Sequence, residues 1–214
     1  MSIKALIFDL HGVLLISEDE KIETTLAKHL KIPEEQVGGI FYGGINDRAD
    51  IGEFPEREYW LLALDAMGLP RSRLPEVEHF YEEYFFIDPS MLEAIHNYRK
   101  YFKTALLSNY ADTLRPALGS IWDISSAFDE IIISCEIKMI KPQPEIFDYT
   151  LKKLHVSKDE AVLVDDRILN IRGALEYGMH AVHFKSRDQA LGEIEKLISA
   201  NNAGRIRQEN LIVE

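Results

Sequence analysis

The chain has 214 residues, of which 46% are hydrophobic and 28% charged. This length and balance suit one domain with a modest insertion, and they exclude a disordered chain or a fibrous repeat. The formal net charge of −12 disfavours nucleic acid as a partner, because an acidic surface repels a phosphodiester backbone. All apolar runs are shorter than a bilayer span, and the first ends at a carboxylate, so we expect neither a membrane segment nor a secretory signal. The single cysteine, Cys135, excludes an intramolecular disulfide and a multi-cysteine zinc site, and it favours a cytoplasmic location.

Five short apolar runs, rich in Ile, Val, Leu and Phe, alternate with longer segments of helical pattern. The runs are apolar at odd and even positions alike, as expected for parallel strands covered by helices on both faces. The alternation is regular from Ser90 onward and predicts an α/β protein with a doubly wound parallel sheet. The expected strands are 3–9, 104–108, 130–134, 161–164 and 180–184, and the expected helices of this part are 90–100, 112–119, 144–154, 168–177 and 187–199.

The interval from residue 17 to residue 88 breaks the alternation. It contains no convincing strand, and its helical patterns are separated by Pro and Gly residues. We therefore predict a small all-helical insertion directly after the first strand. Its expected helices are 18–31, 34–42, 55–67 and 75–86.

The tail from Ala200 begins with helix-stopping Asn and Gly residues and ends in an apolar Leu-Ile-Val segment. An edge strand, a dimer arm and disorder are all compatible with this composition. The sequence leaves the three alternatives open, and it is equally compatible with a monomer and a homodimer.

Polar residues follow the apolar runs at the positions where open α/β sheets bind their ligands, beyond the carboxyl ends of the strands. Each set taken alone is common in turns and helix caps. Their joint occurrence at one edge of one predicted sheet indicates a functional site. The sets are Asp9 to Gly12, Ser108 with Asn109, Lys141 with Pro142, and Asp165 with Asp166.

Three of these side chains, Asp9, Asp165 and Asp166, are carboxylates expected to converge near the centre of the sheet. At a few ångströms their charges repel by about 4 kcal/mol per pair at an effective dielectric near 20. A divalent cation removes this conflict, and Mg²⁺ prefers oxygen ligands. The cation, Lys141 and loop N–H groups would then attract a phosphate, an arrangement that stabilises a transferring phosphoryl group. Asp9 could be the nucleophile, forming an acyl-phosphate that water cleaves.

The segments DLHGVL, LLSNYAD, IKPQPEIF and VLVDDRILNIRGALEYGMHAVHF resemble, in order, the four motifs of the haloacid dehalogenase (HAD) superfamily. The resemblance spans nearly the whole chain and implies a HAD-like Rossmannoid core formed by residues 1–16 and 89–214. Residues 17–88 would form a helical C1 cap over the active site. Within the superfamily, the chain looks most like phosphatases of the group that includes sugar-1-phosphate phosphatases and the N-terminal domain of epoxide hydrolases.

The resemblance implies a Mg²⁺ cofactor and a metal-binding role for four residues. Asp9 would be both nucleophile and ligand, and His11 would offer its backbone carbonyl. Asp166 would be a ligand, and Asp165 either a ligand or a residue behind the ligands. Asn170, four residues after Asp166 on the predicted helix, would orient the Asp166 carboxylate.

The resemblance also implies the contacts to a small phosphorylated metabolite. Ser108 would hold a phosphoryl oxygen with Asn109 beside it, and Lys141 would pair with the nucleophile and the phosphate. In the insertion, the segment 43–48 and Tyr42 are expected to face the substrate. Arg48 could contact a second phosphate or sugar hydroxyls.

His11 occupies the position where family phosphatases usually carry a second Asp, the group that protonates the leaving alkoxide and then deprotonates water. Its imidazole could replace that Asp as acid and base, because its ordinary pKa is near 6.5. Alternatively, His11 marks a slow or altered activity in which another group supplies the proton. A third interpretation is a catalytically silent binding protein.

The paired carboxylates Asp165 and Asp166 favour a phosphatase over the family's L-2-haloacid dehalogenases. Those enzymes also lack the second Asp, but they need no metal and lack the pair. The sequence therefore predicts a Mg²⁺-dependent phosphomonoester hydrolase working through Asp9. The alternatives are a haloacid dehalogenase and a HAD-fold binding protein without turnover.

Overall fold

The computed structural model describes residues 2–18, 21–42 and 44–211, with side chains described as far as Ala200. Its centre is a five-stranded, all-parallel sheet with the strand order β5-β4-β1-β6-β7. The chain runs from the central strand to one edge and then to the other, which confirms the doubly wound α/β fold. The strands are β1 (Ala5–Phe8), β4 (Lys103–Ser108), β5 (Glu130–Ile133), β6 (Ala161–Asp165) and β7 (His180–His183).

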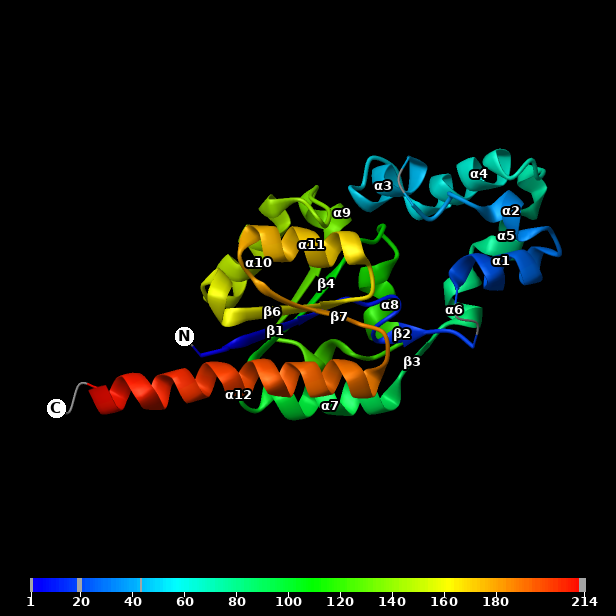
Figure 1. Cartoon of the computed structure of the whole chain (residues 1–214). Helices are drawn as coiled ribbons and strands as arrows, with labels where there is room; N and C mark the ends of the chain where they lie inside the picture. Colours follow the sequence, from blue (N-terminus) through cyan, green and yellow to red (C-terminus); the bar gives the residue numbers. More distant parts are fainter. Residues whose placement is uncertain (1, 19–20, 43, 212–214) are drawn as a thin grey trace.

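Both faces of the sheet are buried, because alternate residues of each strand pack on opposite helical layers (Figure 1). In β1, Leu6 and Phe8 join the apolar cluster that contains Met91 of one layer, while Ile7 joins the cluster that contains Phe147 of the other. All three β1 side chains are completely buried. This two-sided burial explains why the strands read as continuous apolar runs.

Helices cover the sheet at the positions that the sequence predicted. Asp88 caps the first of them, accepting hydrogen bonds from the backbone N–H groups of Ser90 and Met91 at 2.9 and 3.2 Å, as expected for an N-cap carboxylate. In Figure 1, α7 and α12 lie on one face of the sheet and α10 and α11 on the other. The bounds are α7 (Pro89–Arg99), α8 (Leu114–Ser120), α10 (Pro144–Leu154), α11 (Ile168–Tyr177) and α12 (Arg187–Leu211). A four-residue helix, α9 (Ser134–Ile137), directly follows β5.

The tail corrects a prediction. The last helix was expected to end near residue 199, but α12 continues to Leu211. Asn and Gly lower helix propensity by about 1 kcal/mol or less each, which does not terminate a helix that is already formed. The residues after Leu211 lie outside the described part of the chain.

A two-stranded antiparallel ribbon joins the sheet to the inserted segment. It pairs β2 (Leu15–Ile16) with β3 (Phe86–Ile87). The expectation that residues 17–88 contain no strand is therefore wrong at β3. Two-residue strands are too short to produce an alternating pattern that a sequence could reveal.

The segment between the two ribbon strands is helical and lies at one end of the molecule, apart from the layers that cover the sheet (Figure 1). Its aromatic centre is Trp60, which is 1% exposed and packs edge-on against Phe41, Tyr59 and Phe80. The predicted helix 34–42 ends at Val37, and the predicted helix 75–86 is two short helices. The helices are α1 (Ile22–Leu30), α2 (Glu34–Val37), α3 (Ile45–Asp50), α4 (Glu56–Ala66), α5 (Leu74–Val77) and α6 (Phe80–Tyr84).

The inserted segment also contacts the layers around the sheet through the stretch between α3 and α4. The Ser134 hydroxyl donates to the Asp50 carbonyl at 2.6 Å, and the Glu56 N–H donates to the Asp112 carboxylate at 2.8 Å. The segment is thus held at two places, the ribbon and this stretch. No helix among the described residues has the length and apolarity to cross a membrane.

Candidate active site

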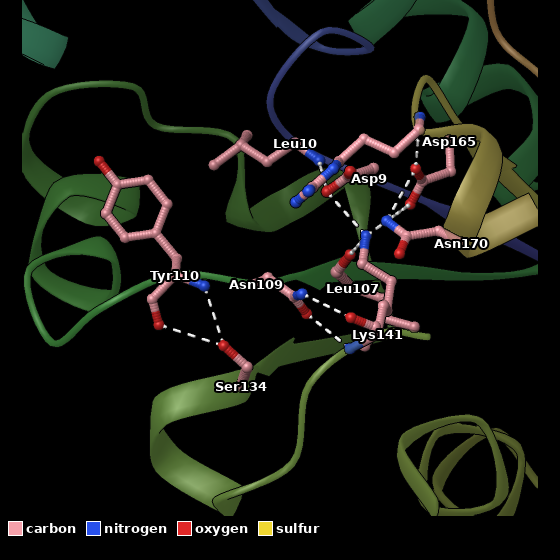
Figure 2. Close-up of polar contacts among 10 residues, drawn as sticks. Asp9, Leu10, Leu107, Asn109, Tyr110, Ser134, Lys141, Asp165 and Asn170 are labelled. Atoms are coloured by element: carbon pink, nitrogen blue, oxygen red, sulfur yellow. Dashed lines mark hydrogen bonds and ion pairs between the residues drawn. The ribbon is translucent and has the colours of Figure 1, made fainter. Parts of the chain in front are cut away.

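The four predicted sets of polar residues lie at the carboxyl edge of the sheet. Figure 2 shows one member of each set: Asp9, Asn109, Lys141 and Asp165. Asp9 follows β1, Ser108 ends β4, and Asp165 ends β6. Lys141 comes from the loop that precedes α10. Because β1 is the central strand and β4 and β6 are its neighbours, these side chains share one crevice.

The Lys141 ammonium is the electrostatic centre of this crevice. Its Nζ lies 2.9 Å from Asp9 Oδ1, 2.7 Å from Asp165 Oδ2 and 2.8 Å from the Leu107 carbonyl oxygen (Figure 2). Burial disfavours the charged amine, but the two carboxylates outweigh that effect, and the pKa of Lys141 is raised. All three N–H bonds therefore have protein acceptors, and the ammonium holds Asp9 and Asp165 in place.

Asp165 is a completely buried anchor for the crevice. Besides Lys141, it accepts hydrogen bonds from the Arg167 N–H at 2.9 Å and from Asn170 Nδ2, which lies 3.0 Å from both oxygens. Asn170 was expected to orient Asp166, and the structure instead places its amide on Asp165. The reason is the helix start: α11 begins at Ile168, so its first turn brings Asn170 back over the end of β6.

Asn109 fixes the loop that carries Lys141. Its Nδ2 donates to the Lys141 carbonyl at 2.9 Å, and its Oδ1 accepts from the Lys141 N–H at 2.8 Å (Figure 2). Neighbouring Ser108 is 2% exposed and lines the cavity described below. The side-chain amide predicted to lie beside a phosphoryl group thus binds backbone, while Ser108 faces the space where such a group would lie.

Asp9, Asp165 and Asp166 each offer an oxygen, and these atoms lie within 4.8 Å of one another. Burial, followed by the charges of the other two carboxylates, raises the pKa of Asp9 well above its usual value despite Lys141. Burial and Asp165 raise the pKa of Asp166 to about 6. One ammonium therefore does not compensate the negative charge. The hard oxygen donors and the excess charge fit a divalent cation such as Mg²⁺.

Gly12 makes room for this arrangement. Its φ of +73° is in the left-handed region, and a Cβ built there would lie 2.4 Å from Asp166 Oδ2. A side chain would displace the Asp166 carboxylate. The oxygens of Asp9 are also differentiated, since its hydrogen bonds in the described chain, from Leu10 N–H at 2.7 Å and from Lys141, both go to Oδ1.

The His11 ring lies among aromatic rings rather than among the acidic groups. Its centroid is 4.8 Å from that of Tyr81, 5.2 Å from Phe85 and 5.4 Å from Tyr110. Burial lowers the pKa of His11 to about 4, so the imidazole is neutral at neutral pH. Its Nε2 is buried and has no hydrogen-bond partner among the residues that the structure describes. His11 thus joins the core crevice to the helical segment, from which Tyr81 and Phe85 come.

A cavity of about 1010 Å³ opens in front of Asp9 and extends under the helical segment. Of the residues predicted to have a catalytic, metal-binding or substrate-binding role, its lining includes all but two. One exception is Asp165, which lies behind the lining. Of the segment 44–48, only Asn46 lines the cavity. The predicted residues on the lining are Asp9, His11, Ser108, Asn109, Lys141, Asp166, Asn170, Tyr42 and Asn46.

Arg48 is the other exception and corrects the prediction of a substrate contact. Its Nε pairs with Glu53 at 2.6 Å, and its guanidinium lies 5.1 Å from the centre of the Phe54 ring. Successive residues of a helix are rotated by about 100°, so Arg48 points away from the side that Asn46 and Asp50 share. Gly43 of the same predicted segment lies outside the described residues.

The cavity residues that were not predicted as site residues include the charged residues Asp50, Glu56 and Arg167. Arg167 is the residue after the carboxylate pair, and its guanidinium lies 4.9 Å from the centre of the Tyr42 ring. Burial is the main cause that raises the pKa of Asp50 and of Glu56 to about 7 each. The position of Arg167 beside Asp166 was a usable signal in the sequence, whereas Asp50 and Glu56 look like ordinary helix-end acids.

The fold thus gathers three carboxylates and one ammonium at the carboxyl end of the central strand. The model of the haloacid dehalogenase-like hydrolases matches residues 3–178, and the chain belongs to this family.

Curated relatives include phosphatases and dehalogenases. The chain is 27% identical to D-ribitol-5-phosphate phosphatase of Bacteroides thetaiotaomicron over 82% of its own length and 89% of that enzyme. It is 28% identical to bifunctional epoxide hydrolase 2 of Sus scrofa over 92% of its length, but it spans only 39% of that protein. A match to (S)-2-haloacid dehalogenase 1 of a Pseudomonas species is 34% identical and covers 38% of this chain and 36% of the enzyme.

Solved structures share the fold. A HAD family enzyme from Bacteroides thetaiotaomicron, crystallised as a magnesium complex, superposes with a TM-score of 0.68 at 24% identity, covering 86% of this chain and 94% of that one. L-2-haloacid dehalogenase from Xanthobacter autotrophicus superposes with a TM-score of 0.64 at 22% identity, covering 87% and 80%. These likenesses establish the architecture.

Proposed function

We propose that this chain is a Mg²⁺-dependent phosphomonoester hydrolase that works through an aspartyl-phosphate on Asp9. The observation that supports this most is the set of three carboxylates with oxygens within 4.8 Å, of which one ammonium neutralises only a part. A divalent cation offsets the remaining charge, and it would attract the oxygens of a phosphate ester. The phosphatase among the relatives supports a phosphorylated small molecule, with sugar phosphates as candidates.

The proposed reaction has two displacements at phosphorus. An Asp9 carboxylate oxygen attacks phosphorus, the bond from phosphorus to the ester oxygen breaks, and that oxygen leaves with a proton. Water then attacks the phosphorus of the aspartyl-phosphate, the bond to Asp9 breaks, and inorganic phosphate is released. Because Oδ1 is held by Leu10 and Lys141, Oδ2 is the oxygen available for attack.

The surrounding residues would prepare these steps. Mg²⁺ bound by Asp9, Asp166 and the His11 carbonyl would supply positive charge near the phosphoryl oxygens. The Ser108 hydroxyl would donate to one of those oxygens. Lys141 would favour the ionised form of Asp9 and orient its carboxylate, and Asp165 with Asn109 would position Lys141.

The His11 ring offers little to the proton transfers of these steps. The ring is neutral, it packs against three aromatic rings, and it is buried away from water. We therefore favour the slow or altered activity among the three interpretations, with the proton supplied by water or substrate. Restoring the usual carboxyl group with His11→Asp is expected to raise kcat at least tenfold, since a positioned acid–base group contributes roughly 10²–10⁴-fold. A fall in kcat would show instead that the imidazole participates.

Residues 17–88 are proposed to act as the cap that covers the cavity, and residues 1–16 and 89–214 as the catalytic core. The contacts at Ser134 and Asp112 support this division, because they bring the inserted segment against the crevice. A cytoplasmic location, and a monomer or homodimer, stay predictions.

A haloacid dehalogenase is the second candidate, supported by the dehalogenase relative and by the absence of a second Asp. A panel of phosphate esters and L-2-chloropropionate, each with and without Mg²⁺, separates the candidates. Metal-dependent phosphate release supports the proposal, and metal-independent chloride release supports the second candidate. Ligand-dependent thermal shifts without turnover would indicate a binding protein.

A further inference from the structure

The leaving group of the substrate would occupy the part of the cavity formed by the helical segment. Two acidic residues there have no ion-pair partner among the described residues. Asp50 ends α3 and Glu56 begins α4, and both line the cavity. They are only 8% and 7% exposed, and we call them the buried acid pair.

The hydrogen bonds of the buried acid pair use only some of its carboxylate oxygens as acceptors. The Asp50 Oδ2 accepts from Asn46 Nδ2 at 2.8 Å, and the Glu56 Oε2 accepts from the Thr113 hydroxyl. None of the ion pairs found in the described chain involves either residue. Burying a carboxylate without a cation is costly, so each carboxylate gains most from a donor that carries positive charge.

The other charged groups of the cavity strengthen this preference. Besides the catalytic residues, the lining has two cationic side chains, Lys21 and Arg167. Three further carboxylates, Glu23, Glu34 and Glu35, join the buried acid pair there. Arg167 acts on Asp50 through its charge but stacks on Tyr42 instead of pairing with it. A leaving group with a second negative charge would therefore meet repulsion, and a positive one attraction.

Aromatic rings complete the surroundings of the acid pair. Tyr42, Tyr59 and Tyr81 line the same cavity. Tyr59 is held in place because its hydroxyl donates to the Ile40 carbonyl at 3.2 Å. Ring faces attract ammonium groups as well, by about 0.5–2 kcal/mol.

We propose that Asp50 and Glu56 are specificity-determining residues that select phosphomonoesters whose leaving group carries an ammonium, such as amino-sugar phosphates. This inference rests on the proposed phosphatase activity. The inference adds two statements to that activity: an amine in the leaving group is preferred to a hydroxyl at the same place, and a second anionic group is rejected.

Three six-carbon phosphates that differ in the charge of the leaving group test this preference directly. They are glucosamine 6-phosphate, glucose 6-phosphate and 6-phosphogluconate. The expected order of kcat/KM is amine first, neutral sugar second and carboxylate last, with at least about a tenfold difference between first and last. p-Nitrophenyl phosphate, which has no amine, serves as the reference substrate.

Asp50→Asn and Glu56→Gln are expected to lower the ratio of kcat/KM for glucosamine 6-phosphate over glucose 6-phosphate at least threefold. This ratio does not depend on the folded fraction, so partial unfolding of a variant does not distort it. Glu58→Gln is the matched control, because Glu58 lies on the same helix as Glu56 but is exposed and does not line the cavity.

Equal turnover of the three sugars by the wild-type enzyme, or unchanged ratios in both variants, would overturn the inference while leaving the phosphatase proposal intact. Failure to release phosphate from any substrate, including p-nitrophenyl phosphate, would overturn the proposed function itself. The wild-type comparison decides the inference even where neither variant folds.

Discussion

The cavity has two buried acidic regions that differ in how their charge is compensated. At the edge of the sheet, Asp9 and Asp165 share the ammonium of Lys141. Under the helical segment, Asp50 and Glu56 have hydrogen bonds, but no ion pair to either is found in the part of the chain that the structure describes. The comparison shows that the protein supplies a cation to the acids of one region, whereas the described residues supply no ion-pair partner to the acids of the other.

The largest expected effect is a loss of kcat from a substitution in the crevice at the edge of the sheet. Asp9→Asn keeps the shape of the side chain but removes the nucleophile, and we expect kcat to fall at least about a thousandfold, as for other catalytic nucleophiles. Phosphate release from p-nitrophenyl phosphate measures the loss. Asp188→Asn, on the exposed face of α12, is the control and should leave kcat unchanged. Comparable activity in Asp9→Asn would exclude the proposed mechanism.

Removing the Lys141 ammonium tests whether it compensates the charges of Asp9 and Asp165. Lys141→Met leaves two buried carboxylates without their cation, and breaking a buried pair in this way costs about 3–5 kcal/mol. The free energy of unfolding, measured in urea at pH 7.5, should fall by that amount. Lys153→Met on the surface of α10 should change it by less than about 0.5 kcal/mol. Equal effects of the two substitutions would mean that Lys141 does not stabilise the crevice.

A substitution in the buried acid pair is expected to change stability in the opposite direction, that is, to raise it. The pKa of Asp50 is about 7, above its ordinary 3.8, because of burial, the charge of Asp47 and that of Glu56, with Arg167 and Asn46 acting against them. The folded state therefore holds a proton that the unfolded chain loses, and stability falls as the pH rises from about 4 to 7. Asp50→Asn should thus stabilise the protein at pH 8, by at most about 4 kcal/mol.

The same substitution should have little stabilising effect near pH 4, where Asp50 is protonated in the folded state and only about half ionised in the unfolded chain. Melting temperatures of wild type and Asp50→Asn between pH 4 and pH 8 measure the difference. A gain that is constant across this range would show that the charge of Asp50 is not its cause.

The sheet and its catalytic edge could be predicted from the sequence because each is a local signal. Strands buried on both faces must be apolar throughout, and the residues after them are forced to one edge by the parallel arrangement. Asp9, Ser108 and Asp166 are found in this way without knowledge of the packing. The helical segment offers no such rule, because its position over the sheet depends on tertiary contacts such as that between Ser134 and the Asp50 carbonyl.

The errors arose where a side chain's direction decides its role. Asp50 lines the cavity, whereas Arg48, two residues earlier in the same helix, points to Glu53. Asn170 serves Asp165 rather than Asp166, although the bounds of α11 were predicted correctly. Asp166 lies before the helix, so the helical spacing of four residues does not bring Asn170 to it.

The most direct test of the account is to trap the phosphorylated carboxylate. Borohydride reduces an acyl-phosphate of Asp to homoserine, which peptide mass spectrometry can locate. In a reaction with Mg²⁺ and a phosphate ester, quenched during turnover, we predict homoserine at position 9 and nowhere else. An unmodified Asp9 in enzyme that is releasing phosphate, or homoserine at another position, would contradict the account.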